Sequence, residues 1–139
     1  MDEAVRPVYQ IIEEKLSGVD CVLAFETASD YLGTNKMTHQ RPAFYVYSTY
    51  ELGIPNVECT IVDSLYSLDI VMERGMRCTS IEQTMWDLLR NDRDQQVIIE
   101  CIADWYFSHN ESYDDLEVPE DISDIFWDYA EDAKHYYDD

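Results

Sequence analysis

Carboxylates are the most abundant side chains of this chain that could take part in chemistry. The sequence has 30 aspartates and glutamates against 9 lysines and arginines, which gives a formal net charge of -21 and a pI near 4.1. Residues 94–139 carry 15 of these acids and a single base, Lys134, so the net charge of that third is -14. Paired carboxylates such as Asp114 and Asp115 can bind a hard cation, but they lack the alternating ligand spacing of a calcium loop. We therefore expect no metal site.

The cysteines show no metal-ligand or disulfide pattern. They lie at least 19 residues apart, so no CxxC or Cys/His spacing for zinc exists. Their apolar neighbours favour small buried thiols in a reducing compartment, and hence a cytoplasmic protein. The four cysteines are Cys21, Cys59, Cys78 and Cys101.

No sequence signature of an enzyme is present. The chain contains no HExxH, no GxSxG and no glycine-rich loop that could cradle a phosphate. The histidines His39, His109 and His135 lie in polar stretches that are typical of surface residues. The sequence therefore predicts neither an enzyme nor a cofactor.

The acidic surplus predicts a basic protein as partner. Like-charge repulsion disfavours direct binding of nucleic acid or of an anionic membrane, whereas the same field attracts basic proteins. We expect a non-enzymatic inhibitor that covers the basic surface of a nucleic-acid-handling protein, such as a toxin or a CRISPR effector nuclease. An anti-CRISPR protein that mimics nucleic acid is one specific form. The predicted contact residues are Asp114, Asp115, Glu117, Glu120, Asp121, Asp124, Asp128, Glu131 and Asp132.

Two other classes of protein stay open at this point. A carboxylate-based, metal-dependent enzyme predicts thermal stabilisation by millimolar magnesium, manganese or calcium. A plain structural subunit uses its charge for solubility alone. The inhibitor instead predicts binding to a basic protein that weakens steeply as salt rises.

Helices are predicted to position most of the acidic segment. Pro119 fits a first helical turn, and residues 111–117 before it are expected to form a flexible acidic loop. Caps and apolar spacing predict further helices over residues 4–17, 22–32, 80–90 and 94–108. The apolar stripe of the last, acidic helix consists of Ile122, Ile125, Phe126, Tyr129, Ala133 and Tyr136.

Strands are predicted in the middle of the chain. Residues 43–48 are dense in aromatic and β-branched side chains, and residues 57–63 and 68–73 have strand length. The short link 64–67 favours an antiparallel hairpin, with residues 74–78 extending its second strand or bulging at Gly75.

The fold class is therefore α/β (α+β), with a small antiparallel or mixed sheet of about three to four strands packed with four to five helices. The length predicts one domain over residues 1–139, with the acidic loop and helix at 111–139. No signal peptide or membrane-spanning stretch is expected.

Two stretches in this order resemble a known family. CVLAFETASDYLG at 21–33 resembles a segment of the AbiEi-type antitoxins of abortive-infection, type IV toxin–antitoxin systems, and RCTSIEQTMWDLLRN at 77–91 is similar to a later helix of that family. The resemblance covers about residues 20–107, without the family's usual N-terminal winged helix and basic composition. It implies an α/β domain that neutralises a nucleotidyltransferase-like toxin. The matching positions are Glu26, Thr27, Ala28, Glu82, Thr84, Asp87, Leu88, Leu89 and Arg90.

Overall fold

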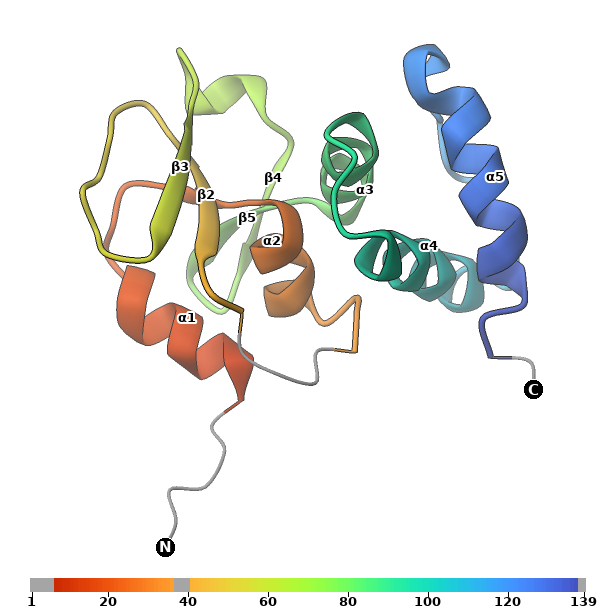
Figure 1. Ribbon diagram of the computed structural model, residues 1–139, viewed down its shortest axis with the longest axis horizontal. Coiled ribbons are helices and arrows are strands. Elements are labelled where there is room, and N and C mark those ends of the chain that lie inside the picture. The colour runs from red at the N-terminus through yellow and green to blue at the C-terminus, as the bar shows by residue number, and fades with distance from the viewer. Residues whose placement is uncertain (1–6, 37–40, 138–139) are drawn as a thin grey trace, which may run out of the picture.

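The computed structural model describes residues 7–36 and 41–137, so the predictions for residues 4–6, 37–40 and His39 lie outside it. The described residues form an α+β fold with five α-helices and a five-stranded mixed sheet (Figure 1). The fold class is confirmed, but the predicted three to four strands were too few. The helices are α1 (Val8–Leu16), α2 (Phe25–Leu32), α3 (Ile81–Arg90), α4 (Gln95–Ser108) and α5 (Ser123–Lys134), with the 3-10 turns η1 (Leu65–Ser67) and η2 (Glu120–Ile122). The strands are β1 (Val22–Leu23), β2 (Phe44–Ser48), β3 (Val57–Ile61), β4 (Ile70–Glu73) and β5 (Met76–Thr79).

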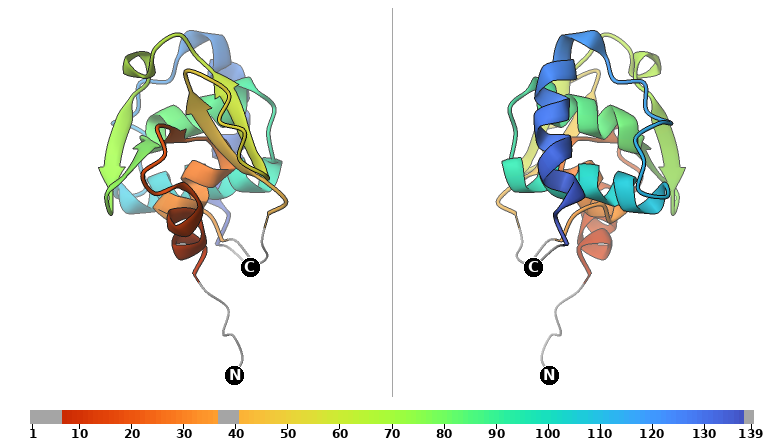
Figure 2. Two further views of the ribbon diagram at one scale, coloured as in Figure 1. Left: turned by 90° about the vertical axis from the view of Figure 1, so that its left-hand side faces the viewer. Right: turned by 90° about the vertical axis from the view of Figure 1, so that its right-hand side faces the viewer.

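The order of strands in the sheet separates the two segments that were predicted to form a hairpin. It is β3-β2-β1-β5-β4, with β2 parallel to β3 and β4 antiparallel to β5. The predicted hairpin between residues 57–63 and 68–73 is wrong, because β3 and β4 occupy opposite edges. Their link contains η1, which the Ser64 side chain caps by accepting a hydrogen bond from the Tyr66 amide, and it carries the chain from one edge to the other (Figure 2).

A tight turn separates β5 from β4, although residues 68–78 were predicted as one strand or as a strand with a bulge. Arg74 and Gly75 both have positive φ, 49° and 84°, which are the conformations that a two-residue type I′ hairpin requires. Glu73 therefore pairs with Met76, and β5 returns along β4 as a strand of its own. The predicted bulge at Gly75 is replaced by this turn.

The predicted helix over residues 22–32 begins too early. Val22 and Leu23 form the central strand β1, where both side chains are fully buried. A short apolar run fits a buried strand as well as a helix, so periodicity alone could not distinguish them. The chain turns into α2 at Phe25, a non-glycine residue with φ of 52°, and α2 ends at Gly33 in the left-handed conformation.

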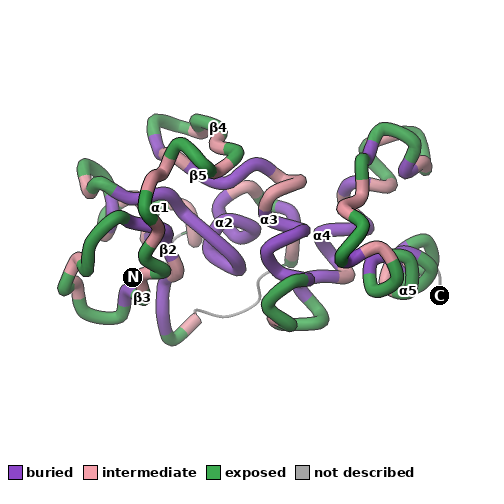
Figure 3. The backbone as a smooth tube through the Cα atoms, turned by 90° about the horizontal axis from the view of Figure 1, so that it is seen from above, coloured by how far each residue is buried: buried purple, intermediate pink, exposed green. Residues whose placement is uncertain are grey.

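Two cores form, one on each face of the sheet. Leu23 and Val46 pack with α1 and part of α2 on one face, while Val22 and Tyr47 pack toward α3 and α4 on the other. Helix α5 packs against α4 and is the element farthest from the sheet (Figure 1). Its outer side consists of exposed residues (Figure 3). None of the described helices is both long enough and apolar enough to cross a bilayer.

Candidate functional site

All nine predicted contact carboxylates are exposed, and they lie in one continuous segment of the chain. Three precede η2, two belong to η2 and four lie on α5. On α5, Asp124, Asp128 and Glu131 are spaced at i, i+4 and i+7, which places them along one side of the helix. With Asp132 they form the surface that we call the acidic face of α5.

The opposite side of α5 fixes the helix to the rest of the molecule. Phe126 is fully buried, and its ring meets Trp86 and Tyr113 edge-on at centroid distances of 5.7 and 5.6 Å. Ala130 and Ala133 continue this buried stripe. The acidic face is therefore carried on a helix whose orientation is set by close packing.

The acidic loop before η2 is held in place rather than free. Tyr113 and Leu116 are buried, and the Tyr113 hydroxyl donates a hydrogen bond of 2.9 Å to the carbonyl oxygen of Ala130 on α5. Tyr113 thus ties the predicted flexible loop at 111–117 to α5, and Leu116 is buried in the same core. The neighbouring acids Asp114, Asp115 and Glu117 are exposed, although Tyr113 and Leu116 are buried.

Exposed apolar side chains flank the acidic face. Ile125 was predicted in the buried stripe, but it is 47% exposed because the helical rotation brings it to the border of the packed side. Trp127 is 48% exposed on the other border, one turn from Asp124 and Glu131. Tryptophan is enriched among the residues that dominate binding energy in protein interfaces. The segment thus presents both charge and apolar contact area.

Two of the predicted contact residues, Asp121 and Glu131, pair with cations of the described fold. The Asp121 carboxylate accepts two hydrogen bonds from the Arg90 guanidinium, at 2.9 and 3.0 Å. These bonds, together with the charge of Arg90, hold the pKa of Asp121 below its usual range. Glu131 lies 4.0 Å from Lys134 and 3.7 Å from the His135 ring. In the described parts of the chain, no cation pairs with Asp124, Asp128 or Asp132.

Several positions that carry the family resemblance have contacts that hold the fold together. Glu26 is 7% exposed and accepts a hydrogen bond of 2.6 Å from Arg93. Thr27 accepts the backbone N–H of Tyr45 on β2 at 2.8 Å. Asp87 of α3 accepts the Tyr47 hydroxyl at 2.8 Å. These side chains join α2, α3 and the sheet, which accounts for their presence without reference to a partner.

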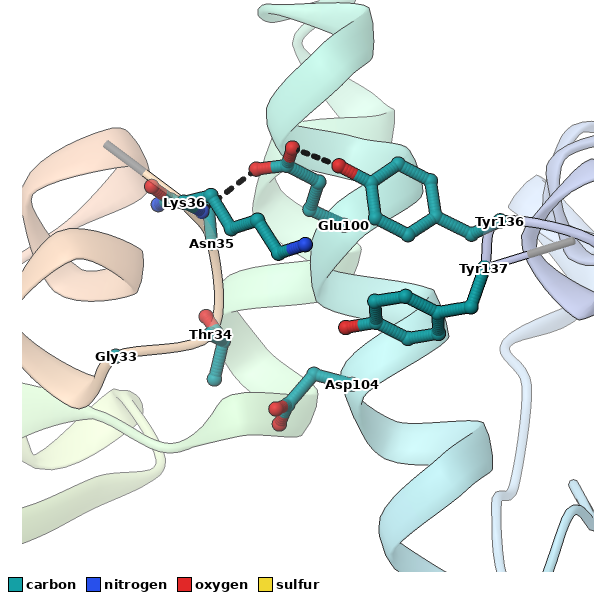
Figure 4. A pocket seen from close by; sticks show the side chains of 8 residues that line it. All are labelled: Gly33, Thr34, Asn35, Lys36, Glu100, Asp104, Tyr136 and Tyr137. Carbon is teal, nitrogen blue, oxygen red and sulfur yellow. Dashed lines mark hydrogen bonds between the residues drawn. The ribbon is translucent and has the colours of Figure 1, made fainter. Parts of the chain in front are cut away.

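A pocket that sequence reasoning missed lies between the end of α2, α4 and the segment after α5 (Figure 4). Its volume is about 160 Å³. Glu100 on α4 accepts hydrogen bonds from the backbone N–H of Lys36 at 2.7 Å and from the Tyr136 hydroxyl. Burial raises the pKa of Glu100, but these bonds outweigh it and leave the pKa lowered. The pocket could not be predicted from the spacing of residues in the sequence, because its lining residues come from segments as far as about 100 positions apart.

All four cysteines lie in the described part of the chain as free thiols. Cys21, Cys78 and Cys101 are buried as predicted, Cys59 is half-buried, and none is in a disulfide. Burial raises the pKa of the Cys101 thiol to about 12, which keeps it protonated and unreactive.

One histidine lies in an environment other than the predicted one. His109 is half-buried and stacks on Trp105 at a centroid distance of 3.8 Å, whereas the sequence placed it on the surface. His135 is exposed as predicted. Within residues 7–36 and 41–137, no group of three or more His, Cys, Asp or Glu side chains could hold a metal ion.

The fold and the site define a class: an α+β protein that presents an acidic helix on the side away from its sheet. Comparison of the chain with protein-family models and with curated proteins finds no match. The resemblance to AbiEi-type antitoxins therefore stays a prediction.

Proposed function

We propose that this protein is a non-enzymatic inhibitor that binds a basic, nucleic-acid-handling protein through the acidic face of α5. The observation that carries the proposal is the exposure of Asp124, Asp128 and Asp132 without a cation from the described residues, on a helix fixed by close packing. Such charges repel one another, and a basic partner relieves that repulsion. A toxin or a CRISPR effector nuclease has a surface of the required chemistry.

The spacing of the carboxylates supports mimicry of nucleic acid. Asp124 and Asp128 are four residues apart, which corresponds to about 6 Å along the helix axis. Phosphates of one DNA strand follow one another at about 3.4 Å along the duplex axis, so these carboxylates are spaced roughly like every second phosphate. Lysines and arginines that hold phosphates could therefore contact α5 instead. Trp127 and Ile125 add apolar contacts that a phosphate backbone does not offer.

Neutralising the acidic face is expected to abolish tight binding to the partner. A triple variant with Asp124→Asn, Asp128→Asn and Asp132→Asn should weaken binding by about 100-fold at low salt, because charge pairs across an interface are lost. The partner is first isolated by affinity capture from the host at low salt. The dissociation constants of both forms are then measured by titration calorimetry over a range of salt concentrations.

A matched control removes the same amount of charge from the other end of the molecule. Glu51, Glu58 and Asp63 are exposed around the β2–β3 edge of the sheet, and their conversion to Gln, Gln and Asn also changes the net charge by three. This control should bind the partner within about threefold of the unmodified protein, since long-range effects are screened by salt. Equal weakening by both variants would show that only net charge matters, and the proposed binding face would be wrong.

A further inference from the structure

The pocket between α2, α4 and the segment after α5 has the chemistry of a cation-binding slot. Two tyrosine rings, Tyr136 and Tyr137, form one wall and meet edge-on at 5.0 Å (Figure 4). The carboxylates of Glu100 and Asp104 on α4 also line it. Aromatic faces and carboxylates are the two kinds of group that attract ammonium and guanidinium ions.

A cation of the chain itself already occupies this slot. The Nζ atom of Lys36 lies 4.9 Å from the ring centroid of Tyr137 and 5.5 Å from that of Tyr136, distances at which the rings attract it. The Lys36 side chain is exposed, and the pocket is partly open to solvent. The contact is therefore one that an incoming cation could replace.

One carboxylate of the slot is left without a partner. Asp104 is half-buried, and no hydrogen bond or ion pair reaches its carboxylate from the described residues. Burial raises the pKa of Asp104, and the charge of His109 offsets this only in part. Figure 4 shows the Asp104 carboxylate, the Tyr137 hydroxyl and the Lys36 ammonium around the same hollow. The Asp104 carboxylate therefore keeps its hydrogen-bond acceptors free for a donor that enters this hollow.

We propose that this slot receives an arginine side chain of the basic partner, which displaces Lys36, stacks on the ring of Tyr137 and donates hydrogen bonds to Asp104. The source of the arginine rests on the proposed function, whereas the binding of a guanidinium does not. Arginine fits better than lysine, because its planar group stacks on aromatic rings while its N–H groups pair with a carboxylate. A volume of about 160 Å³ is smaller than the usual pocket for a drug-sized ligand and suits one side chain.

The test uses a capped amino acid, so that it does not depend on finding the partner. Nα-acetyl-arginine amide is titrated into the 15N-labelled protein and followed by amide chemical shifts. We expect the shifts to concentrate at residues 33–36, 100–104 and 136–137. The uncharged analogue Nα-acetyl-citrulline amide, which has nearly the same shape, should give no shifts there.

Three variants separate a built slot from general attraction to an acidic protein. Asp104→Asn should weaken binding of the arginine amide about tenfold, since a charge-assisted hydrogen bond is lost. Lys36→Gln should strengthen it by about threefold or more, because the competing cation is gone. Asp63→Asn, near the β2–β3 edge of the sheet, removes the same charge and should change the affinity by less than about twofold.

The result that would overturn the proposal is equal weakening by Asp104→Asn and Asp63→Asn, or shifts spread along α5 instead of around the slot. An unchanged affinity in Lys36→Gln would also exclude displacement of that side chain. The amide spectrum of each variant is compared with that of the unmodified protein to check that the variant is folded. The proposed function fails separately, through the triple neutralisation of α5, so the two ideas can be distinguished.

Discussion

Replacement of Phe126 by alanine is expected to lower the free energy of unfolding by about 3 to 5 kcal/mol, the range for truncating a buried aromatic side chain. The ring is fully buried and contacts Trp86 of α3, Tyr113 of the acidic loop and Trp127. Its removal leaves a cavity where three elements meet, and small alanines on α5 cannot fill it. Urea unfolding followed by far-ultraviolet circular dichroism measures the change.

The neighbouring position provides a control on the same helix. Ile125 is 47% exposed, so Ile125→Ala removes little buried area and should change the free energy of unfolding by less than about 1 kcal/mol. If Phe126→Ala were as mild as Ile125→Ala, α5 would not be packed as described. The acidic face would then lack the fixed orientation on which the proposed function depends.

Removal of Arg93 is expected to cost about 3 kcal/mol of stability, because it leaves a buried carboxylate without its cation. Arg93 donates hydrogen bonds to both oxygens of Glu26, and its guanidinium lies 4.6 Å from the ring centroid of Phe25 and 4.4 Å from that of Tyr45. Phe25 is the residue with positive φ at the start of α2, so Arg93 also covers the most constrained point of that turn. Urea unfolding of Arg93→Met at pH 7 tests this.

An exposed ion pair serves as the comparison for Arg93. Arg77 lies 2.7 Å from Asp20, but both side chains are more than a third exposed. Arg77→Met should therefore change the free energy of unfolding by less than about 1 kcal/mol. Equal effects of the two substitutions would contradict a special role for the buried pair.

The buried pair of Glu26 and Arg93 also predicts a dependence of stability on pH. Burial raises the pKa of Glu26, but the hydrogen bonds and charge of Arg93 outweigh it, so the folded-state pKa lies below the ordinary value of 4.5. Ionised Glu26 therefore stabilises the fold above the ordinary pKa, and this contribution is lost as the pH falls through the lowered value. The stability difference between the unmodified protein and Glu26→Gln should be constant from about pH 7 to 5.5 and shrink on further acidification. A difference that grows in acid would reverse the assigned direction.

The helices of the second half could be predicted because their signals are local. Ser80 accepts the backbone N–H of Gln83, and Asp94 accepts those of Gln96 and Val97, as expected for N-terminal caps. Each signal involves residues within one helical turn. Helices α3 and α4 therefore begin within one residue of the predicted positions. The last helix was predicted from Pro119, but the 3-10 turn η2 follows that residue and α5 begins at Ser123.

The sheet could not be predicted to the same extent, because strand pairing depends on contacts between distant residues. Leu23 pairs with Cys78, more than 50 positions away, and nothing near Leu23 indicates that partner. The link at 64–67 is short enough for a hairpin, yet β3 finds a longer partner in β2. The left-handed turn at Arg74 was missed because arginine is not a residue typical of that conformation.

The candidate site divides in the same way. The exposure of the acids on α5 could be predicted, because composition and helical spacing can be read directly from the sequence. The hydrogen bonds between Asp121 and Arg90 join residues that are 31 positions apart. The slot at Asp104 depends on Lys36 and Tyr137, which are about 100 positions apart in the sequence. Such contacts exist only after the fold is formed.

The central position of β1 has a consequence for the synthesis of the chain on the ribosome. Strand β1 can pair with β2 early in translation. Its other neighbour, β5, begins at Met76, more than 50 residues after the end of β1 at Leu23. Translation then adds α3 and α4 before α5, whose Phe126 docks onto Trp86. All five strands are thus synthesised before the most strongly anionic part of the chain, residues 111–134, leaves the ribosome.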